Sequence, residues 1–443
     1  MDAEACYRAV QGRDARFAGR FFIAVRTTRI YCRPGCPARL PRRENVEFYP
    51  SAAAAEQAGF RACLRCRPEA SPGSPAQAGT AATLSRALRL LEESGEAAGL
   101  ADRLGVSDRH LRRLFARHLG APPAAVLRTR RLELARQLIE SSALPMIEVA
   151  ESAGFSSLRR FNDAIRHGFG RTPTDLRRKK NNYFFSQPST LEVRLPLRPP
   201  LDFEAMLDFF GRRGLPGVEE VRDGAWRRTL PEGVLEVRRS GESHLLARIP
   251  VGAAKNALTI AARIQRVFDL RADPGPIVEH LSRDPLLRPF LRPGLRVPGA
   301  WDPFEMGVRA ILGQQISVER ARDLAAGLGP ITPDALAGAE IRGMPGVRAR
   351  AIPALARAVL EGKVGLDGSQ GLDAFTAAMC DVPGVGQWTA QVVAMRVLGE
   401  PDAFPAADLG LCRALGMTPR QLELRSQSWR PWRAYAAAAV WLS

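Results

Sequence analysis

Four of the seven cysteines in the chain fall into two close pairs. Three residues separate Cys32 from Cys36, two separate Cys63 from Cys66, and 26 residues lie between the pairs. A short spacing places two thiols on one turn, and two such turns can complete tetrahedral coordination of zinc. The sequence therefore predicts one four-cysteine zinc site, which is either a structural clip or a centre with a reactive thiolate.

A second candidate site lies toward the C-terminus, where residues 382–393 read VPGVGQWTAQVV and one acidic residue, Asp408, follows in an uncharged run. The glycines end one helix and allow a phosphate to approach the backbone of the next helix, whose first N–H groups attract anions. We expect Gly384, Val385 and Gly386 to contact a phosphate backbone. In the alternative interpretation, the turn is an ordinary helix connection and Asp408 is only an N-cap.

Two segments in the middle of the chain share the pattern of a helix, a glycine turn and a second helix capped by serine. They cover residues 100–117 and 149–166, and a long helix is expected between them at about 123–141. The alternative is a generic helical bundle with a solvated basic face. The candidate DNA contacts are the arginines near the starts of the second helices: Arg109, Arg112, Arg113, Arg159 and Arg160.

The overall charge also indicates a polyanionic partner. The 443 residues carry a net charge of +18, divided as +6 over residues 1–79, +8 over 80–180 and +4 over 181–443. No apolar run long enough to cross a membrane occurs, and the first residues lack the pattern of a signal peptide. We therefore expect a cytoplasmic protein, located at the bacterial nucleoid, whose cysteines stay reduced.

The N-terminal motifs resemble two known families. Residues 26–39, RTTRIYCRPGCPAR, together with AGFRACLRC at 58–66, resemble the N-terminal zinc domain of Ada. This resemblance implies that Cys32 accepts a methyl group from a methylphosphotriester in DNA. The duplicated helix-turn-helix pattern, which ends in FGRTP at 169–173, resembles an AraC-type DNA-binding domain.

The C-terminal motifs resemble the helix-hairpin-helix DNA glycosylases. The hairpin sequence at 382–393, with RAILGQQIS at 309–317 and WRPWRAY at 429–435, is similar to the AlkA branch, the 3-methyladenine glycosylases. Members that also cleave the strand have a lysine where this chain has Trp388, so the resemblance implies a monofunctional enzyme in which Asp408 supports attack by water.

The same resemblance implies the residues that receive an extruded base. Phe209, Trp388 and Trp441 would line its pocket, although each aromatic could instead belong to the core. Gln315 would fill the gap left in the duplex. The better-known AlkA proteins have an apolar residue at this position, and Gln315 could also be an ordinary residue at the start of a helix.

About three domains are expected for this length. The fold class expected is multidomain and mostly α, with small α+β parts. Residues 1–70 would form the zinc-binding methyl-acceptor domain, 71–79 a linker, 80–180 the AraC-type domain, and 188–443 the AlkA-type glycosylase with a small antiparallel sheet and a helical bundle.

These expectations combine into a bifunctional protein of DNA alkylation repair and response. It would hydrolyse the N-glycosidic bond of alkylated bases at Asp408 and transfer a methyl group once to Cys32, with one Zn²⁺ and no redox or nucleotide cofactor. The expected partners are alkylated double-stranded DNA, promoter DNA and RNA polymerase, with no membrane, and the chain would be a monomer. The alternative is a transcription factor whose glycosylase body only binds DNA.

Overall fold

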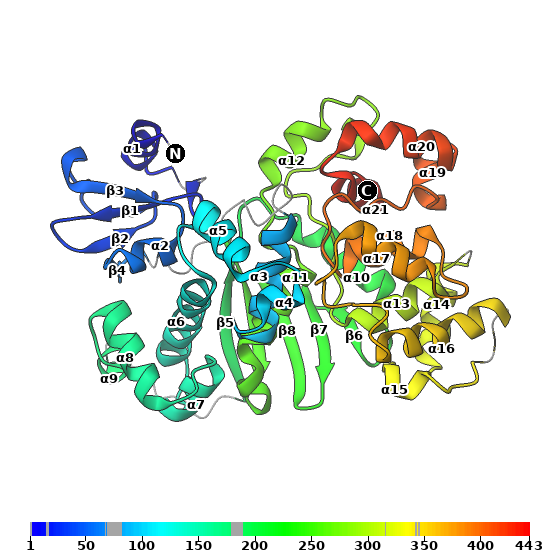
Figure 1. Cartoon of the computed structure of the whole chain (residues 1–443), viewed down its shortest axis with the longest axis horizontal. Helices are drawn as coiled ribbons and strands as arrows, with labels where there is room; N and C mark the ends of the chain where they lie inside the picture. Colours follow the sequence, from blue (N-terminus) through cyan, green and yellow to red (C-terminus); the bar gives the residue numbers. More distant parts are fainter. Residues whose placement is uncertain are drawn as a thin grey trace. The chain divides into compact units, whose positions relative to one another are not determined.

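The structure is a computed structural model and describes residues 2–14, 17–66, 68, 82–178, 189–314, 316–341, 343 and 346–443. The expected linker at 71–79 and the expected wedge Gln315 lie outside these residues. The chain divides into two compact units (Figure 1). One contains residues 1–77, 87–199 and 230–262, and the other contains residues 78–86, 200–229 and 263–443.

A small four-stranded sheet carries the N-terminal cysteines, with strand order β3-β1-β2-β4. Strand β1 pairs antiparallel with β2 and β3, whereas β2 and β4 run parallel, with Tyr31 opposite Ala62. This parallel pair brings the two cysteine segments to neighbouring strand ends. The elements are α1 (Ala3–Gln11), β1 (Phe22–Val25), β2 (Ile30–Cys32), η2 (Arg43–Asn45), β3 (Val46–Tyr49), α2 (Ala52–Gln57) and β4 (Arg61–Ala62).

The two predicted helix-turn-helix patterns are present. Ser107 caps α5 by accepting a hydrogen bond from the backbone N–H of His110, and Ser157 caps α8 by accepting one from Arg160. The long intervening helix runs over Pro123–Ser141, as the sequence indicates. The helices are α3 (Ala82–Ser94), α4 (Leu100–Arg103), α5 (Asp108–Leu119), α6 (Pro123–Ser141), α7 (Met146–Ser152), α8 (Leu158–Phe169) and α9 (Pro173–Arg178).

A five-stranded sheet follows, with order β5-β9-β8-β7-β6. Turns follow Leu230 and Arg239, and α10, a helix that was not predicted from the sequence, follows β5. Burial of Phe203, Met206 and Phe210 on one face of α10 explains this helix, since their spacing is helical. The elements are β5 (Thr190–Pro196), α10 (Phe203–Arg213), β6 (Glu219–Arg222), β7 (Ala225–Leu230), β8 (Gly233–Arg239) and β9 (His244–Pro250).

The remainder is helical from Val251 to the end. Among the described residues, no helix combines the length and apolarity needed to cross a membrane. The elements are η5 (Val251–Asn256), α11 (Ala257–Val267), α12 (Pro274–Leu281), η6 (Arg288–Phe290), α13 (Pro303–Leu312), α14 (Val318–Ala326), α15 (Pro333–Leu336), α16 (Gly346–Leu360), α17 (Leu372–Cys380), α18 (Gln387–Arg396), α19 (Leu409–Leu415), α20 (Pro419–Ser426), η7 (Gln427–Trp429) and α21 (Arg433–Trp441).

Candidate functional site

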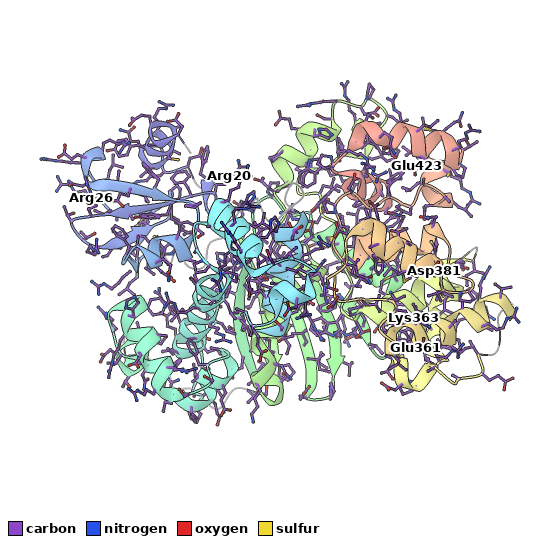
Figure 2. The ribbon with its side chains drawn as sticks, in the orientation of Figure 1. Arg20, Arg26, Glu361, Lys363, Asp381 and Glu423 are labelled. Carbon is purple, nitrogen blue, oxygen red and sulfur yellow. The ribbon has the colours of Figure 1, made fainter. Side chains whose placement is uncertain are left out.

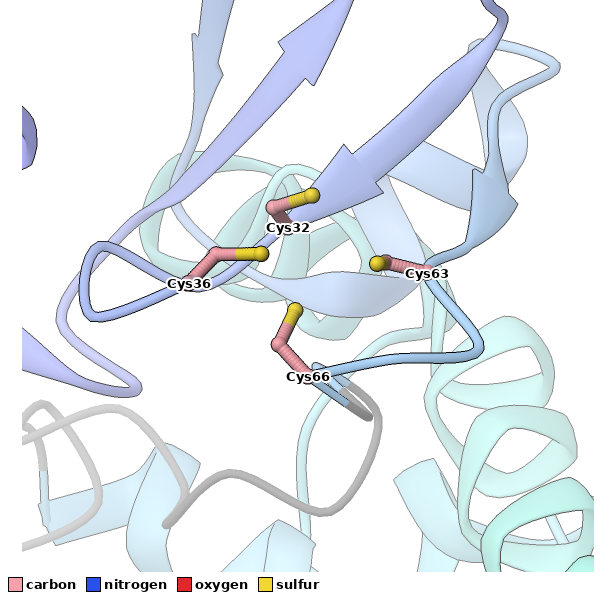
Figure 3. A group of neighbouring side chains, drawn as sticks. All are labelled: Cys32, Cys36, Cys63 and Cys66. Atoms are coloured by element: carbon pink, nitrogen blue, oxygen red, sulfur yellow. The ribbon is translucent and has the colours of Figure 1, made fainter. Parts of the chain in front are cut away.

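The four paired cysteines meet at one point. Cys32 ends β2 and Cys36 lies on the loop that follows, whereas Cys63 and Cys66 lie on the loop after β4 (Figure 3). All four sulfur atoms lie within 4.8 Å of one another. Cys63 is held there by its backbone N–H, which donates to the Tyr31 carbonyl at 3.0 Å. The β2–β4 pairing thus converts two distant sequence segments into one cluster.

This cluster fits a zinc ion. Zinc–sulfur bonds of about 2.3 Å in a tetrahedron place the sulfurs roughly 3.8 Å apart, and the cluster is compact enough for that arrangement. The Cys32 thiol donates hydrogen bonds to the other three sulfurs, and these bonds, together with burial, raise the pKa of Cys32. Cys36 accepts one of them, which lowers the pKa of Cys36 to about 7. Four thiols this close cannot all ionise unless a cation offsets their mutual repulsion. The donor set therefore supports one Zn²⁺ held by Cys32, Cys36, Cys63 and Cys66.

Polar contacts that were not predicted from the sequence connect the zinc loops to the helix-turn-helix region. The Tyr31 hydroxyl donates to Glu56 Oε1 at 2.8 Å, and Thr129 Oγ1 of α6 donates to Glu56 Oε2 at 2.6 Å. On the same helix, Arg136 donates to the carbonyl of Leu64, between Cys63 and Cys66, at 3.2 Å. The residue beside Cys32 and the second cysteine loop are thus both connected to α6.

The predicted DNA-contacting arginines lie on the surface. All five are exposed, whereas Leu111 and Phe115 of α5, and Phe161 and Ile165 of α8, are buried. The two second helices therefore present basic faces to solvent. This exposure suits DNA binding, as the helix-turn-helix geometry predicts, and it also occurs in the generic basic bundle. The contact role of Arg109, Arg112, Arg113, Arg159 and Arg160 stays a prediction.

The glycine hairpin joins α17 to α18, and Asp381 marks the end of α17 (Figure 2). Gly384 has a φ of +85°, and a Cβ added there would lie 2.8 Å from the Ala351 Cβ, so both its conformation and its packing require glycine. Gly386 caps α18 without a side-chain hydrogen bond and is exposed, with open space around the position of a Cβ. The first N–H groups of α18 are therefore accessible to an anion.

Asp408 lies between two indoles. Its Oδ2 accepts a hydrogen bond from Trp388 Nε1 at 3.0 Å, and its Oδ1 accepts one from Trp441 Nε1 at 3.4 Å. The same Oδ1 accepts a bond from the Leu411 backbone at 3.0 Å, which makes Asp408 the N-cap of α19. The N-cap role considered from the sequence is therefore present, but capping alone requires neither indole. The contacts bring together three of the residues predicted for one site.

Phe209 reaches the same site from α10. Its ring stacks with Trp441 at a centroid distance of 6.4 Å and an interplanar angle of 25°. Because Phe209 is only 1% exposed, it forms the buried backing of Trp441 rather than an open wall. The indole of Trp441 is partly exposed and is therefore the accessible aromatic surface of this pair.

A cavity of about 390 Å³ lies beside Trp388. Its walls come from α18, the segment before Asp408 and the regions around α20 and α21. Neither Asp408 nor Phe209 nor Trp441 belongs to the lining. The lining residues are Gln387, Trp388, Gln391, Phe404, Pro405, Ala406, Ala407, Pro419, Glu423, Arg430 and Arg433. Trp388 thus both lines this cavity and donates a hydrogen bond to the Asp408 carboxylate.

Two arginines at the Phe209 ring and the hydrogen bonds of Gln314 were not predicted from the sequence. The guanidinium carbons of Arg213 and Arg396 lie 4.1 and 5.0 Å from the centroid of the Phe209 ring. The four-residue spacing from Phe209 to Arg213 on a helix is the signal that could have revealed the first of them. In addition, Gln314 Nε2 donates to Thr389 Oγ1 at 2.9 Å and to the Gly384 carbonyl at 3.3 Å, which ties the segment before Gln315 to the hairpin.

Three families match consecutive parts of the chain. The metal binding domain of Ada matches residues 5–69, a helix-turn-helix domain matches 100–179, and the AlkA N-terminal domain matches 192–302. The order of these matches agrees with the order of motifs in the sequence.

Curated relatives match the whole chain or its separate parts. The chain is 42% identical, over 99% of its length and 96% of the relative, to a probable bifunctional transcriptional activator/DNA repair enzyme AlkA of Mycobacterium tuberculosis. It is 34% identical to DNA-3-methyladenine glycosylase 2 of Escherichia coli, over 55% of this chain and 94% of that protein. It is 43% identical to the bifunctional transcriptional activator/DNA repair enzyme Ada of E. coli, over 31% of this chain and 38% of that protein.

Proposed function

The chain belongs to the family of AlkA-type bifunctional transcriptional activator/DNA repair enzymes, and from this premise we propose that it excises alkylated bases from DNA and senses methylated phosphates. The excised bases are of the 3-methyladenine type. The observation that carries the proposal is the Asp408 carboxylate, held by the indoles of Trp388 and Trp441 next to a glycine hairpin.

In the glycosylase reaction, the hairpin backbone holds the strand while the damaged nucleotide turns out of the duplex. The bond between the sugar C1′ and the base nitrogen breaks, and its electron pair leaves with the base. Positive charge develops on the sugar, and the Asp408 carboxylate stabilises it. Water then adds to C1′ and loses a proton. No amine occupies the position of Trp388, so the strand is not cut through a Schiff base.

At the N-terminal site, zinc when bound keeps the cysteine sulfurs deprotonated and therefore nucleophilic. Cys32 Sγ attacks the methyl carbon of a methylphosphotriester, a sulfur–carbon bond forms, and the carbon–oxygen bond breaks with its electron pair going to the phosphate oxygen. The product is a thioether, so one negative charge leaves the cluster. Weaker repulsion toward DNA then strengthens binding by the helix-turn-helix region, which promotes transcription.

Base release from DNA methylated with dimethyl sulfate tests the glycosylase half, using the full chain and its Asp408→Asn variant. We expect free 3-methyladenine from the wild-type protein and only trace release from the variant, with unchanged DNA binding. Full release by Asp408→Asn would exclude the mechanism.

The second candidate is a transcription factor whose glycosylase body only binds DNA, and the exposed basic helices α5 and α8 favour it. It predicts no base release at all, together with promoter binding that increases after Cys32 is methylated. RNA polymerase as a partner, a monomeric state and location at the nucleoid belong to the proposal in either case. Mass spectrometry of Cys32 after incubation with methylated DNA separates a reactive centre from a structural zinc.

A further inference from the structure

A guanidinium covers the aromatic backing of the glycosylase site. Arg213 lies one helical turn after Phe209 on α10, and its guanidinium carbon is 4.1 Å from the centre of the Phe209 ring. The carbonyl of Arg213 accepts a hydrogen bond from Arg309, which holds the end of α10 against α13. Among the described residues, no carboxylate lies within ion-pairing distance of the Arg213 guanidinium itself. Its charge is therefore offset only by the ring and by more distant groups.

Arg213 differs in this respect from its cationic neighbours. Arg396, which also contacts Phe209, donates to the carbonyls of Pro298 and Gly299 at 3.0 and 3.2 Å. Arg309 is paired with Glu219 and Glu305 at 3.3 and 3.2 Å. Both of these arginines use their donors within the protein, whereas no acceptor for the Arg213 guanidinium is found in the part of the chain that the structure describes, so its donors are available for a ligand.

A chain of contacts through Phe209 and Trp441 leads from Arg213 to the Asp408 carboxylate. Phe209 stacks on Trp441, and the indole of Trp441 donates to Asp408. Burial lowers the pKa of Arg213 to about 10, and the negative charges of Asp408 and Glu319 counteract that effect. Arg213 is consequently a cation at neutral pH and lies within electrostatic range of the carboxylate.

We propose that Arg213 is a specificity-determining residue that favours release of neutral oxopurines over cationic alkylated purines at the Asp408 site. The inference rests on the proposed glycosylase function and deepens it. Guanidinium donors match the O6 and N7 acceptors of a 6-oxopurine. The same positive charge repels a base whose ring is already cationic.

The Arg213 cation is expected to affect release of the two kinds of base in opposite directions, because their charge changes differently as the bond to the sugar breaks. When the C1′–N9 bond of an N7-methylated purine breaks, its electron pair neutralises a positive ring, and a nearby cation opposes binding of the charged ground state. When the same bond of neutral hypoxanthine breaks, the pair makes the departing base anionic until it takes a proton from water. A guanidinium stabilises that developing negative charge, as other preorganised donors do.

The test compares two duplexes that differ only in the damaged base, one with 7-methylguanine and one with hypoxanthine. Single-turnover release rates and DNA dissociation constants are measured for the full-length wild type, Arg213→Met and Arg213→Lys. Arg212→Met is the matched control, because Arg212 is the exposed neighbour on the same helix. Thermal melting of each variant verifies that α10 remains packed.

We expect Arg213→Met to lower the hypoxanthine rate and to raise or preserve the 7-methylguanine rate, so that their ratio changes by at least about tenfold. Arg213→Lys keeps the charge and should recover part of the ratio, and Arg212→Met should leave it unchanged. Equal losses on both bases, together with weaker DNA binding, would instead assign Arg213 to a phosphate and overturn the inference. Absence of hypoxanthine release by wild-type protein that releases 7-methylguanine would also overturn it.

Failure of the proposed glycosylase function would give results different from failure of the Arg213 inference. If the wild-type chain releases neither base, or if Asp408→Asn releases both at the wild-type rate, the glycosylase mechanism fails irrespective of Arg213.

Discussion

The cysteine cluster and the surroundings of Asp408 both concentrate negative charge, but they balance it differently. In the cluster, four thiols compete for protons within 4.8 Å, and only a metal ion allows all of them to ionise. Around Asp408, two indole N–H groups and one backbone N–H share a single carboxylate. In the proposed function, the first arrangement supplies a polarisable nucleophile and the second supplies a fixed charge.

This difference explains why one site would be used once and the other repeatedly. A zinc-bound thiolate that accepts a methyl group becomes a thioether and cannot react again. A carboxylate with three donors has its charge delocalised and its orientation fixed, which suits stabilising a transient cation more than forming a bond.

The largest effect is expected from Cys32→Ala. Removing the attacking sulfur should abolish methyl transfer, because Cys36, Cys63 and Cys66 are not the acceptor in the proposed reaction. Incubation with methylphosphotriester DNA followed by mass spectrometry of the peptides measures this loss. Cys380→Ser is the control, since Cys380 lies outside the cluster. A methyl adduct on Cys36 in the Cys32→Ala protein would contradict the assignment.

A smaller but still large effect is expected from Asp408→Asn. Asparagine also caps helices, so α19 should remain folded while the rate of base release falls by about 10²–10³-fold. The measurement is single-turnover release from alkylated duplex DNA, with binding followed separately. Asp334→Asn, at an exposed position in the first turn of α15, should retain the wild-type rate. Loss of DNA binding in parallel would mean that Asp408 is structural.

Removing one indole donor tests how the carboxylate is held. Trp388→Phe deletes a 3.0 Å bond and Trp441→Phe a 3.4 Å bond, so we expect the first to slow base release more, by about tenfold or somewhat above. Trp432→Phe is the control, because that indole packs on Tyr435 instead. If neither exchange changes the rate, the indoles do not orient Asp408.

The smallest effect concerns the buried contact between Glu56 of α2 and Thr129 of α6. Thr129→Val removes the hydroxyl that donates to buried Glu56, which leaves a carboxylate oxygen without this donor and should cost about 1–3 kcal/mol of stability. Urea denaturation of the full chain measures the difference against Thr28→Val, at an exposed position. Equal stability of the two variants would show that the Glu56 contact does not hold these segments together.

Local chemistry explains which parts were predictable. The cysteine spacing, the serine caps of α5 and α8, and the glycine of the hairpin depend on a few neighbouring residues, and each predicted its element correctly. Helix α10 was not predicted, because the alternating pattern of the strands on either side of it was extended across Phe203, Met206 and Phe210, whose spacing is helical. The roles of the predicted site residues stay predictions, although three of them meet at Asp408.

What the sequence determined by itself is the set of reactive groups, their order along the chain and the families they resemble, because spacing and turn chemistry act over a few residues. Only the tertiary structure placed Glu56 between Tyr31 and Thr129 and closed two indoles on Asp408. These contacts join residues of different elements that lie 20 to 73 positions apart in the sequence. Burial of charged and polar groups is permitted only where such partners meet.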